Sequence, residues 1–175
     1  MMEYKDREEP GQYNVNHIIA KSLYFGLVLN IIFPAILIFI CYYINDNQPT
    51  LNRVGNFAMP LFYIIVVLAI LQGGLAFYLR NKILNIPVIE NKGTFSEDLA
   101  QALGRHIRPV FILIALIAVY GFIYFFLTGR FKEALMMTIF SYLIFQVIRP
   151  RFGFVRKLIK VQEKFAGEGK FIQRQ

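Results

Sequence analysis

Four long apolar segments, separated by polar ones, dominate the hydrophobic pattern of this chain. They cover residues 23–44, 57–79, 110–127 and 132–148. A helix needs about 20 apolar residues to cross a bilayer core of about 30 Å. The segments lack the alternation of apolar and polar residues that barrel strands show, so the pattern predicts four transmembrane helices. The fourth segment is short, and a re-entrant segment is the alternative there.

The polar segments predict how the helices are connected. The first two helices join through a turn at 45–56, the last two through Thr128–Gly129–Arg130, and a connector at 80–109 links the two hairpins. We expect an all-α integral membrane protein, a four-transmembrane-helix bundle of two hairpins. No cleavable signal peptide is evident, so the first helix is expected to remain as an anchor. The chain then has three parts, which are 1–22, 23–148 and 149–175.

The basic residues are distributed unevenly around the four segments. Sixteen of the nineteen Lys and Arg residues fall in the N-terminal segment, the connector and the tail, and the other three (Arg53, Arg130 and Lys132) lie in the two turns or at the start of the fourth segment. Cytoplasmic loops carry an excess of Lys and Arg. We therefore predict a multi-pass protein of the cell (inner or plasma) membrane with both termini in the cytoplasm. On this interpretation the net charge of +8 reflects topology, and no nucleic-acid partner is expected.

The connector is predicted to contain a short amphipathic helix. Thr94 and Glu97 fit a capping box, in which a hydroxyl and a carboxylate bond the first free amides of a helix. Apolar residues then recur at helical spacing up to Pro109, where the third transmembrane helix is expected to begin. We interpret this helix as an elbow lying on the membrane, with a docking surface as the alternative.

The tail is predicted to form a basic amphipathic helix that ends near Gly167–Glu168–Gly169. Its apolar residues, such as Phe154 and Leu158, share one face, and its basic residues lie opposite them. Such a helix suits an anionic membrane surface, and docking onto an acidic partner is the alternative. The predicted anionic-lipid contacts are Arg149, Arg151, Arg156, Lys157, Lys160 and Lys164.

The polar residues inside the apolar segments are neutral. Buried charges in a membrane usually mark function, and none lies in the central part of a segment, which disfavours a proton-coupled transporter. Asn30 and Gln72 are expected at similar depth and could face each other. We interpret the neutral polar residues as interhelical hydrogen-bonding groups, with the lining of a solute pathway as the alternative. The predicted polar contacts are Asn30, Gln72, Thr138, Ser141 and Gln146.

Two further features concern packing and metal binding. Pro34 is expected to kink the first helix, and Gly73–Gly74 to allow close packing of the second. His17 and His106 each precede an apolar segment and form a candidate pair for a haem iron or a metal. With one cysteine and no acidic cluster to support them, we expect no cofactor and no metal site.

The sequence contains no catalytic motif of the common hydrolase, nucleotide-binding or metalloprotease types. We therefore predict a non-enzymatic small polytopic membrane protein, an accessory or structural subunit of a larger membrane complex. A small transporter or channel working as a homo-oligomer is the second hypothesis, and a membrane enzyme acting on lipid the third. The expected partners are anionic lipids at the cytoplasmic face and a membrane protein or a second copy of the chain.

Overall fold

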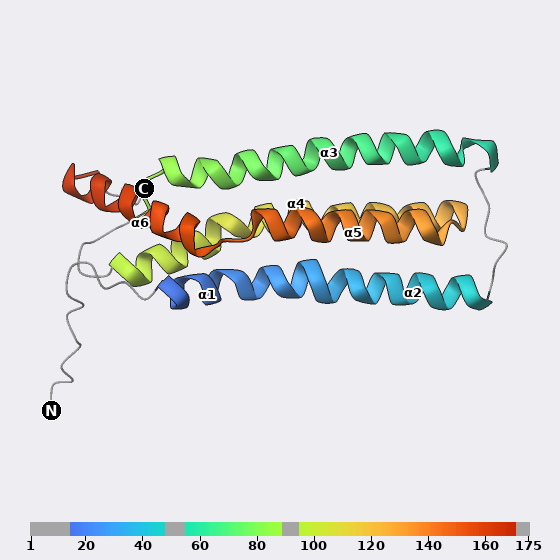
Figure 1. Cartoon of the computed structure of the whole chain (residues 1–175), viewed down its shortest axis with the longest axis horizontal. Helices are drawn as coiled ribbons and strands as arrows, with labels where there is room; N and C mark the ends of the chain where they lie inside the picture. The colour runs from blue at the N-terminus through green and yellow to red at the C-terminus, as the bar shows by residue number, and fades with distance from the viewer. Residues whose placement is uncertain (1–14, 48–54, 89–94, 171–175) are drawn as a thin grey trace, which may run out of the picture.

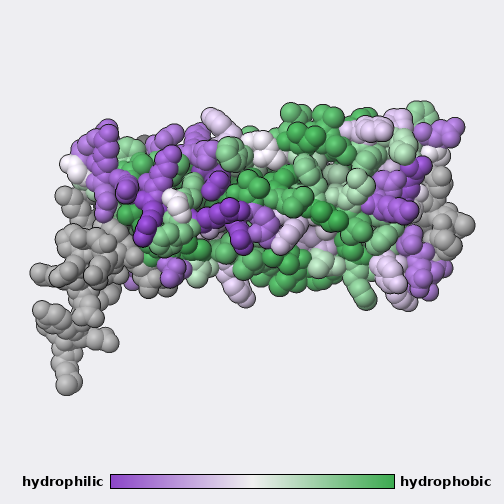
Figure 2. All heavy atoms as spheres, in the orientation of Figure 1, coloured by the Kyte–Doolittle hydropathy of each residue, from purple (hydrophilic) through white to green (hydrophobic). Residues whose placement is uncertain are grey.

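A computed structural model describes residues 15–47, 55–88 and 95–170 of the chain. This part is all-helical, and four of its helical segments are long and apolar enough to span a membrane. Hydrophobic residues cover the middle of the helices, and hydrophilic residues gather toward both ends (Figure 2). The prediction of a multi-pass membrane protein with four spans is confirmed at the level of helix length and composition.

The first span is a continuous helix with a wider turn in its middle. It consists of α1 (Val15–Leu27), the π-helical turn η1 (Val28–Ile32) and α2 (Phe33–Asn47). It is longer at both ends than the predicted 23–44, because helical structure continues into flanking polar residues. Pro34 has no N–H to donate, and a π turn lies directly before it; the kink predicted at Pro34 stays a prediction. At the end of η1 the N–H of Phe33 donates to the carbonyl of Val28, five residues earlier.

The second span, α3 (Ala58–Lys82), lies between the 3₁₀ turns η2 (Gly55–Phe57) and η3 (Ile83–Asn85). Its buried residues are Ala58, Ala69 and Ala76, while large apolar side chains such as Leu71 point outward. The alanines let α3 approach α4 and α5 closely. Most of the helix surface remains available to lipid or to another protein.

The third and fourth spans are α4 (Phe95–Thr128) and α5 (Phe131–Ile148). α4 runs behind α5 in Figure 1 and contacts α1, α2, α3 and α5, which makes it the central helix. The two helices meet at Gly129, whose φ of 68° is a left-handed conformation that suits glycine. The predicted turn at Thr128–Gly129–Arg130 is therefore confirmed.

The prediction of a separate connector helix that ends before Pro109 is wrong. Pro109 lies inside α4, which continues without a break from Phe95 into the third span. A proline inside a helix removes one hydrogen bond, here to the carbonyl of Arg105. Both residues lie on the exposed side of α4, where that carbonyl can meet solvent. The opposite side is packed inside the protein, and this packing keeps the helix continuous. Thr94, the first residue of the predicted capping box, lies outside the described residues.

The tail helix α6 (Phe152–Gly167) forms a compact end region with the starts of α1 and α4 and the segment after α3 (Figure 1). It ends as predicted, with Gly169 at a φ of 71°. α6 and the first turns of α4 each bury one apolar face inside this region rather than exposing it. The shared core consists of Ile18, Ile83, Leu84, Val88, Phe95, Leu99, Leu103, Ile107, Val155, Leu158 and Ile159.

Candidate functional site

Two of the predicted intramembrane polar residues connect neighbouring spans. The Gln72 side-chain amide on α3 donates to the carbonyl of Leu113 at 2.7 Å. The Ser141 hydroxyl on α5 donates to the next carbonyl of α4, that of Ile114, at 2.8 Å. Both bonds end on the same turn of α4, so they hold α3 and α5 to it at one level.

Thr138 and Gln146 make no such connection. The Thr138 hydroxyl donates within its own helix to the carbonyl of Ala134 at 3.1 Å. The main-chain carbonyl of Gln146 accepts a hydrogen bond from Arg151 at 2.8 Å, and its side chain is half-buried. These two residues therefore contribute to local structure around α5.

Asn30 lies in the π turn and does not bond Gln72. Its side-chain Nδ2 donates to the carbonyl of Gly26 at 3.1 Å. The residue is 1% exposed, and its Oδ1 is buried without a hydrogen-bond partner. A buried acceptor without a donor is unfavourable by about 1–3 kcal/mol, so this atom is the most unusual feature of the spans.

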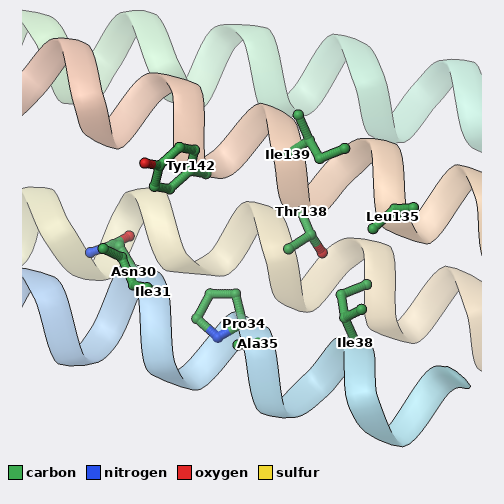
Figure 3. Close-up of a pocket in the computed structure, with 9 residues that line it drawn as sticks. All are labelled: Asn30, Ile31, Pro34, Ala35, Ile38, Leu135, Thr138, Ile139 and Tyr142. Atoms are coloured by element: carbon green, nitrogen blue, oxygen red, sulfur yellow. The ribbon is translucent and has the colours of Figure 1, made fainter. Parts of the chain in front are cut away.

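A groove of about 220 Å³ opens beside Asn30, between the first span and α5. Pro34, Ala35 and Thr138 provide small groups in its centre (Figure 3). Larger apolar side chains surround them from both helices. The groove thus combines a mainly apolar surface with the wall residue Asn30, whose Oδ1 accepts no hydrogen bond. Its lining residues are Asn30, Ile31, Pro34, Ala35, Ile38, Leu135, Thr138, Ile139 and Tyr142.

A second groove, of about 300 Å³, lies on the other side of α5 and faces α3. Gly73 lies in it, and a Cβ at this position would come within 2.9 Å of Ile144 Cδ1. Gly74 has open space instead, so the glycine pair allows close packing at one of its two positions. The groove is lined by apolar residues throughout, which are Gly73, Phe77, Phe140, Leu143, Ile144, Val147 and Ile148.

The basic face of α6 is exposed, as the sequence pattern predicts, but its apolar face is not free. The predicted basic residues Arg156, Lys157, Lys160 and Lys164 all point outward. Val155 and Leu158 on the other side are fully buried against the protein. The charged face is therefore the part of α6 that can meet a membrane surface.

Sequence reasoning missed Gln162, which is completely buried on α6. Its Oε1 accepts a hydrogen bond from the Val88 N–H at 3.0 Å, and its Nε2 donates to the Ile86 carbonyl at 2.8 Å. A glutamine among apolar residues on a helix wheel is the signal that could have revealed this contact. It fixes the segment after α3 to α6.

An ion pair marks the end of α6. The Glu168 carboxylate accepts a hydrogen bond from Lys170 Nζ at 2.8 Å. This bond and the lysine charge lower the pKa of Glu168 below its usual value. Both side chains are exposed, so the pair is a surface feature.

The histidine pair and catalysis gain no support from the described residues. His17 lies in α1 and His106 in α4, and the side chain of His17 lies outside the part described, so that pair stays a prediction. In the described ranges, no three His, Cys, Asp or Glu residues come together as metal ligands would. The single cysteine, Cys41, is buried between α2 and its neighbours.

Searches against protein-family models, curated proteins and solved structures give no match to this chain.

Proposed function

We propose that the protein is an accessory or structural subunit of a larger membrane complex. On this proposal the groove between α2 and α5 receives a transmembrane helix of the partner. The observation that carries the proposal is the buried Oδ1 of Asn30, which has no donor and lies in the wall of that groove.

In this proposal the four spans cross the cell membrane as a bundle of two hairpins, and the α6 end faces the cytoplasm. The uneven distribution of Lys and Arg supports this orientation. The exposed basic face of α6 then meets the cytoplasmic leaflet. Each basic residue near an anionic surface contributes about 1 kcal/mol of attraction.

The groove suits a protein helix better than a lipid tail. An acyl chain has no hydrogen-bond donor at this depth, whereas Ser, Thr, Tyr, Asn or Gln on a partner helix does. Because Asn30 Oδ1 is buried, its side chain would have to turn toward the groove to accept such a bond. The small groups of Pro34, Ala35 and Thr138 would let a second helix approach closely.

Solute transport has less support. A polar pathway needs free polar groups, and the side chains of Gln72 and Ser141 are already bonded to α4. The two grooves beside α5 are lined mainly by apolar residues. The neutral polar residues therefore support the interhelical interpretation.

Co-purification in mild detergent, followed by native mass spectrometry, tests the proposal. We expect the wild-type chain to retain one or more protein partners. Ala35→Trp fills the groove and is expected to release the partner that occupies it. Ile36→Trp places the same side chain on the next residue of α2, which is 52% exposed and outside the groove, and is expected to retain it. Isolation of the wild-type chain as a lone monomer would contradict the proposal.

A further inference from the structure

Three arginines follow one another closely in sequence where α5 turns into α6, and the end of α3 lies beside this turn, since Arg80 stacks on Phe154 of α6. Arg149 and Arg151 lie between the two helices, Arg156 lies in the second turn of α6, and Arg80 lies in the last turn of α3. The ion pairs in the described ranges involve other basic residues, which are Arg130, Lys164 and Lys170. The four arginine charges are therefore balanced by no carboxylate of the described residues.

Aromatic rings and a carbonyl hold three of these guanidinium groups in place. Arg80 Cζ lies 4.4 Å from the ring centre of Phe154, and Arg156 Cζ lies 4.2 Å from that of Phe152. Arg151 Nη2 donates to the carbonyl of Gln146 at 2.8 Å. Stacking on a ring leaves the edge of a guanidinium free to donate hydrogen bonds. The arrangement is thus preorganised for an acceptor.

Arg80 has a hydrogen-bond donor that an anion could satisfy. Its Nε is buried and has no hydrogen-bond partner. The charge of Arg151 lies near enough to repel that of Arg80. A phosphate between the two would offset this repulsion and accept from several guanidinium N–H groups, since arginine binds phosphate in a bidentate way.

The depth of the cluster indicates the source of the phosphate. Arg80 lies at the end of the second span, and Arg149 directly follows the fourth. In a membrane-spanning chain both positions are at the level of the lipid headgroups. The start of α6 adds a favourable field, because its side chains leave the first amides uncapped.

We propose that the arginines at the α5–α6 turn, with Arg80 of α3, form a binding site for the phosphate of an anionic phospholipid headgroup. The inference rests on the proposed membrane-spanning arrangement and adds a specific ligand site to the general attraction of the basic face. It does not depend on a protein partner. The two proposals can therefore fail separately.

Native mass spectrometry of the full chain, titrated with phosphatidylglycerol or phosphatidylcholine in detergent, measures the binding. The double variant Arg80→Gln/Arg151→Gln removes two charges at the site and is called the elbow variant here, after the α5–α6 turn. The control variant Lys160→Gln/Lys164→Gln removes two charges from the exposed face of the same helix. We expect the elbow variant to lose about tenfold or more in phosphatidylglycerol affinity and the control less than twofold, since tenfold corresponds to about 1.4 kcal/mol.

Equal losses in the two variants would overturn the site and leave only general electrostatic attraction. An unchanged affinity in the elbow variant would overturn it as well. If the elbow variant fails to fold, Arg80→Lys and Arg151→Lys keep the charge and remove the planar fork, and each is expected to weaken binding several-fold. Full retention of affinity in both lysine variants would then overturn the site.

Inorganic phosphate distinguishes the two sources of the ligand. Added at about 10 mM, roughly ten times a millimolar Kd, it should leave bound phosphatidylglycerol in place if the site holds a lipid. Displacement of the lipid at this concentration would assign the site to a soluble phosphate and overturn the lipid assignment. Co-purification of the elbow variant with protein partners is expected to match wild type, which keeps this result separate from the proposed subunit role.

Discussion

Gln162 on α6 holds the main chain of Val88 with its side-chain amide. The Val88 N–H donates to Gln162 Oε1 at 3.0 Å, and Gln162 Nε2 donates to the Ile86 carbonyl at 2.8 Å, one residue on each side of Pro87. The main chain after α3 pairs with no strand in the described ranges. The side chain of Gln162 supplies two of its hydrogen bonds instead. Through this contact the position of α6, with its basic face and the arginine cluster, depends on the end of the second span.

Gln162→Leu should loosen this end of the protein. The substitution keeps the volume but leaves the buried Val88 N–H without an acceptor, which is expected to lower the free energy of unfolding by about 2 kcal/mol. Hydrogen exchange at the Val88 amide checks the prediction, since it should become faster in the variant. Gln101→Leu, an exposed glutamine on α4, is the control and should leave exchange at Val88 unchanged.

Gly121→Ala should destabilise the contact between α4 and α5. An added Cβ would lie 2.8 Å from Met137 Cβ and 3.0 Å from the Ala134 carbonyl oxygen. Overpacking of this kind costs about 1–3 kcal/mol. The matched control is Gly104→Ala on the same helix, where nothing lies within 4 Å of the new Cβ. That substitution should stabilise by up to about 1 kcal/mol, because alanine favours helix. Thermal unfolding in detergent measures both, and equal effects would contradict the packing described.

Gln72→Leu and Ser141→Ala should each have a small effect. Hydrogen bonds between transmembrane helices contribute about 0.6 kcal/mol on average, and these two join different helices to α4. The double variant is expected to lose roughly the sum of the two single effects in unfolding free energy.

If the protein instead carries a solute, these changes, combined with Asn30→Leu, should alter flux in proteoliposomes. Unchanged flux is the result that the subunit proposal expects.

The sequence predicted the spans well because hydrophobicity in long segments depends on local composition. Two of the four predicted spans, 57–79 and 132–148, match the observed helices to within three residues at each end, and the turn at Gly129 follows from a residue suited to positive φ. The continuity of α4 through Pro109 was not predictable in this way. It depends on Leu99 and Leu103 packing inside the protein, and packing partners distant in sequence are not visible in a local pattern.

The candidate sites show the same limit. Asn30 was identified from its polarity, but its lack of a donor depends on how α2 and α5 are placed. The basic residues of α6 were recognised from helical spacing. Arg80 was counted only as a charge that indicates orientation, since its approach to Phe154 joins residues that are far apart in sequence.

The orientation can be tested with single engineered thiols in a Cys41→Ala background. Lys132→Cys places an exposed thiol at the start of α5, and Lys160→Cys places one on the exposed face of α6. A membrane-impermeant reagent added to intact cells should label the first and not the second. Labelling of the thiol at position 160 would contradict the cytoplasmic assignment of the α6 end.

Photo-crosslinking in native membranes tests the proposed partner surface most directly. A photoreactive residue at Ile139, 50% exposed in the groove beside Asn30, is compared with one at Ile70, 56% exposed on α3. Ile70 follows Ala69, which packs near Met137, so the two probes lie at similar depth. The account predicts a discrete crosslinked product with another membrane protein from position 139 and none from position 70. Crosslinking to lipid alone at both positions would contradict the proposed subunit role.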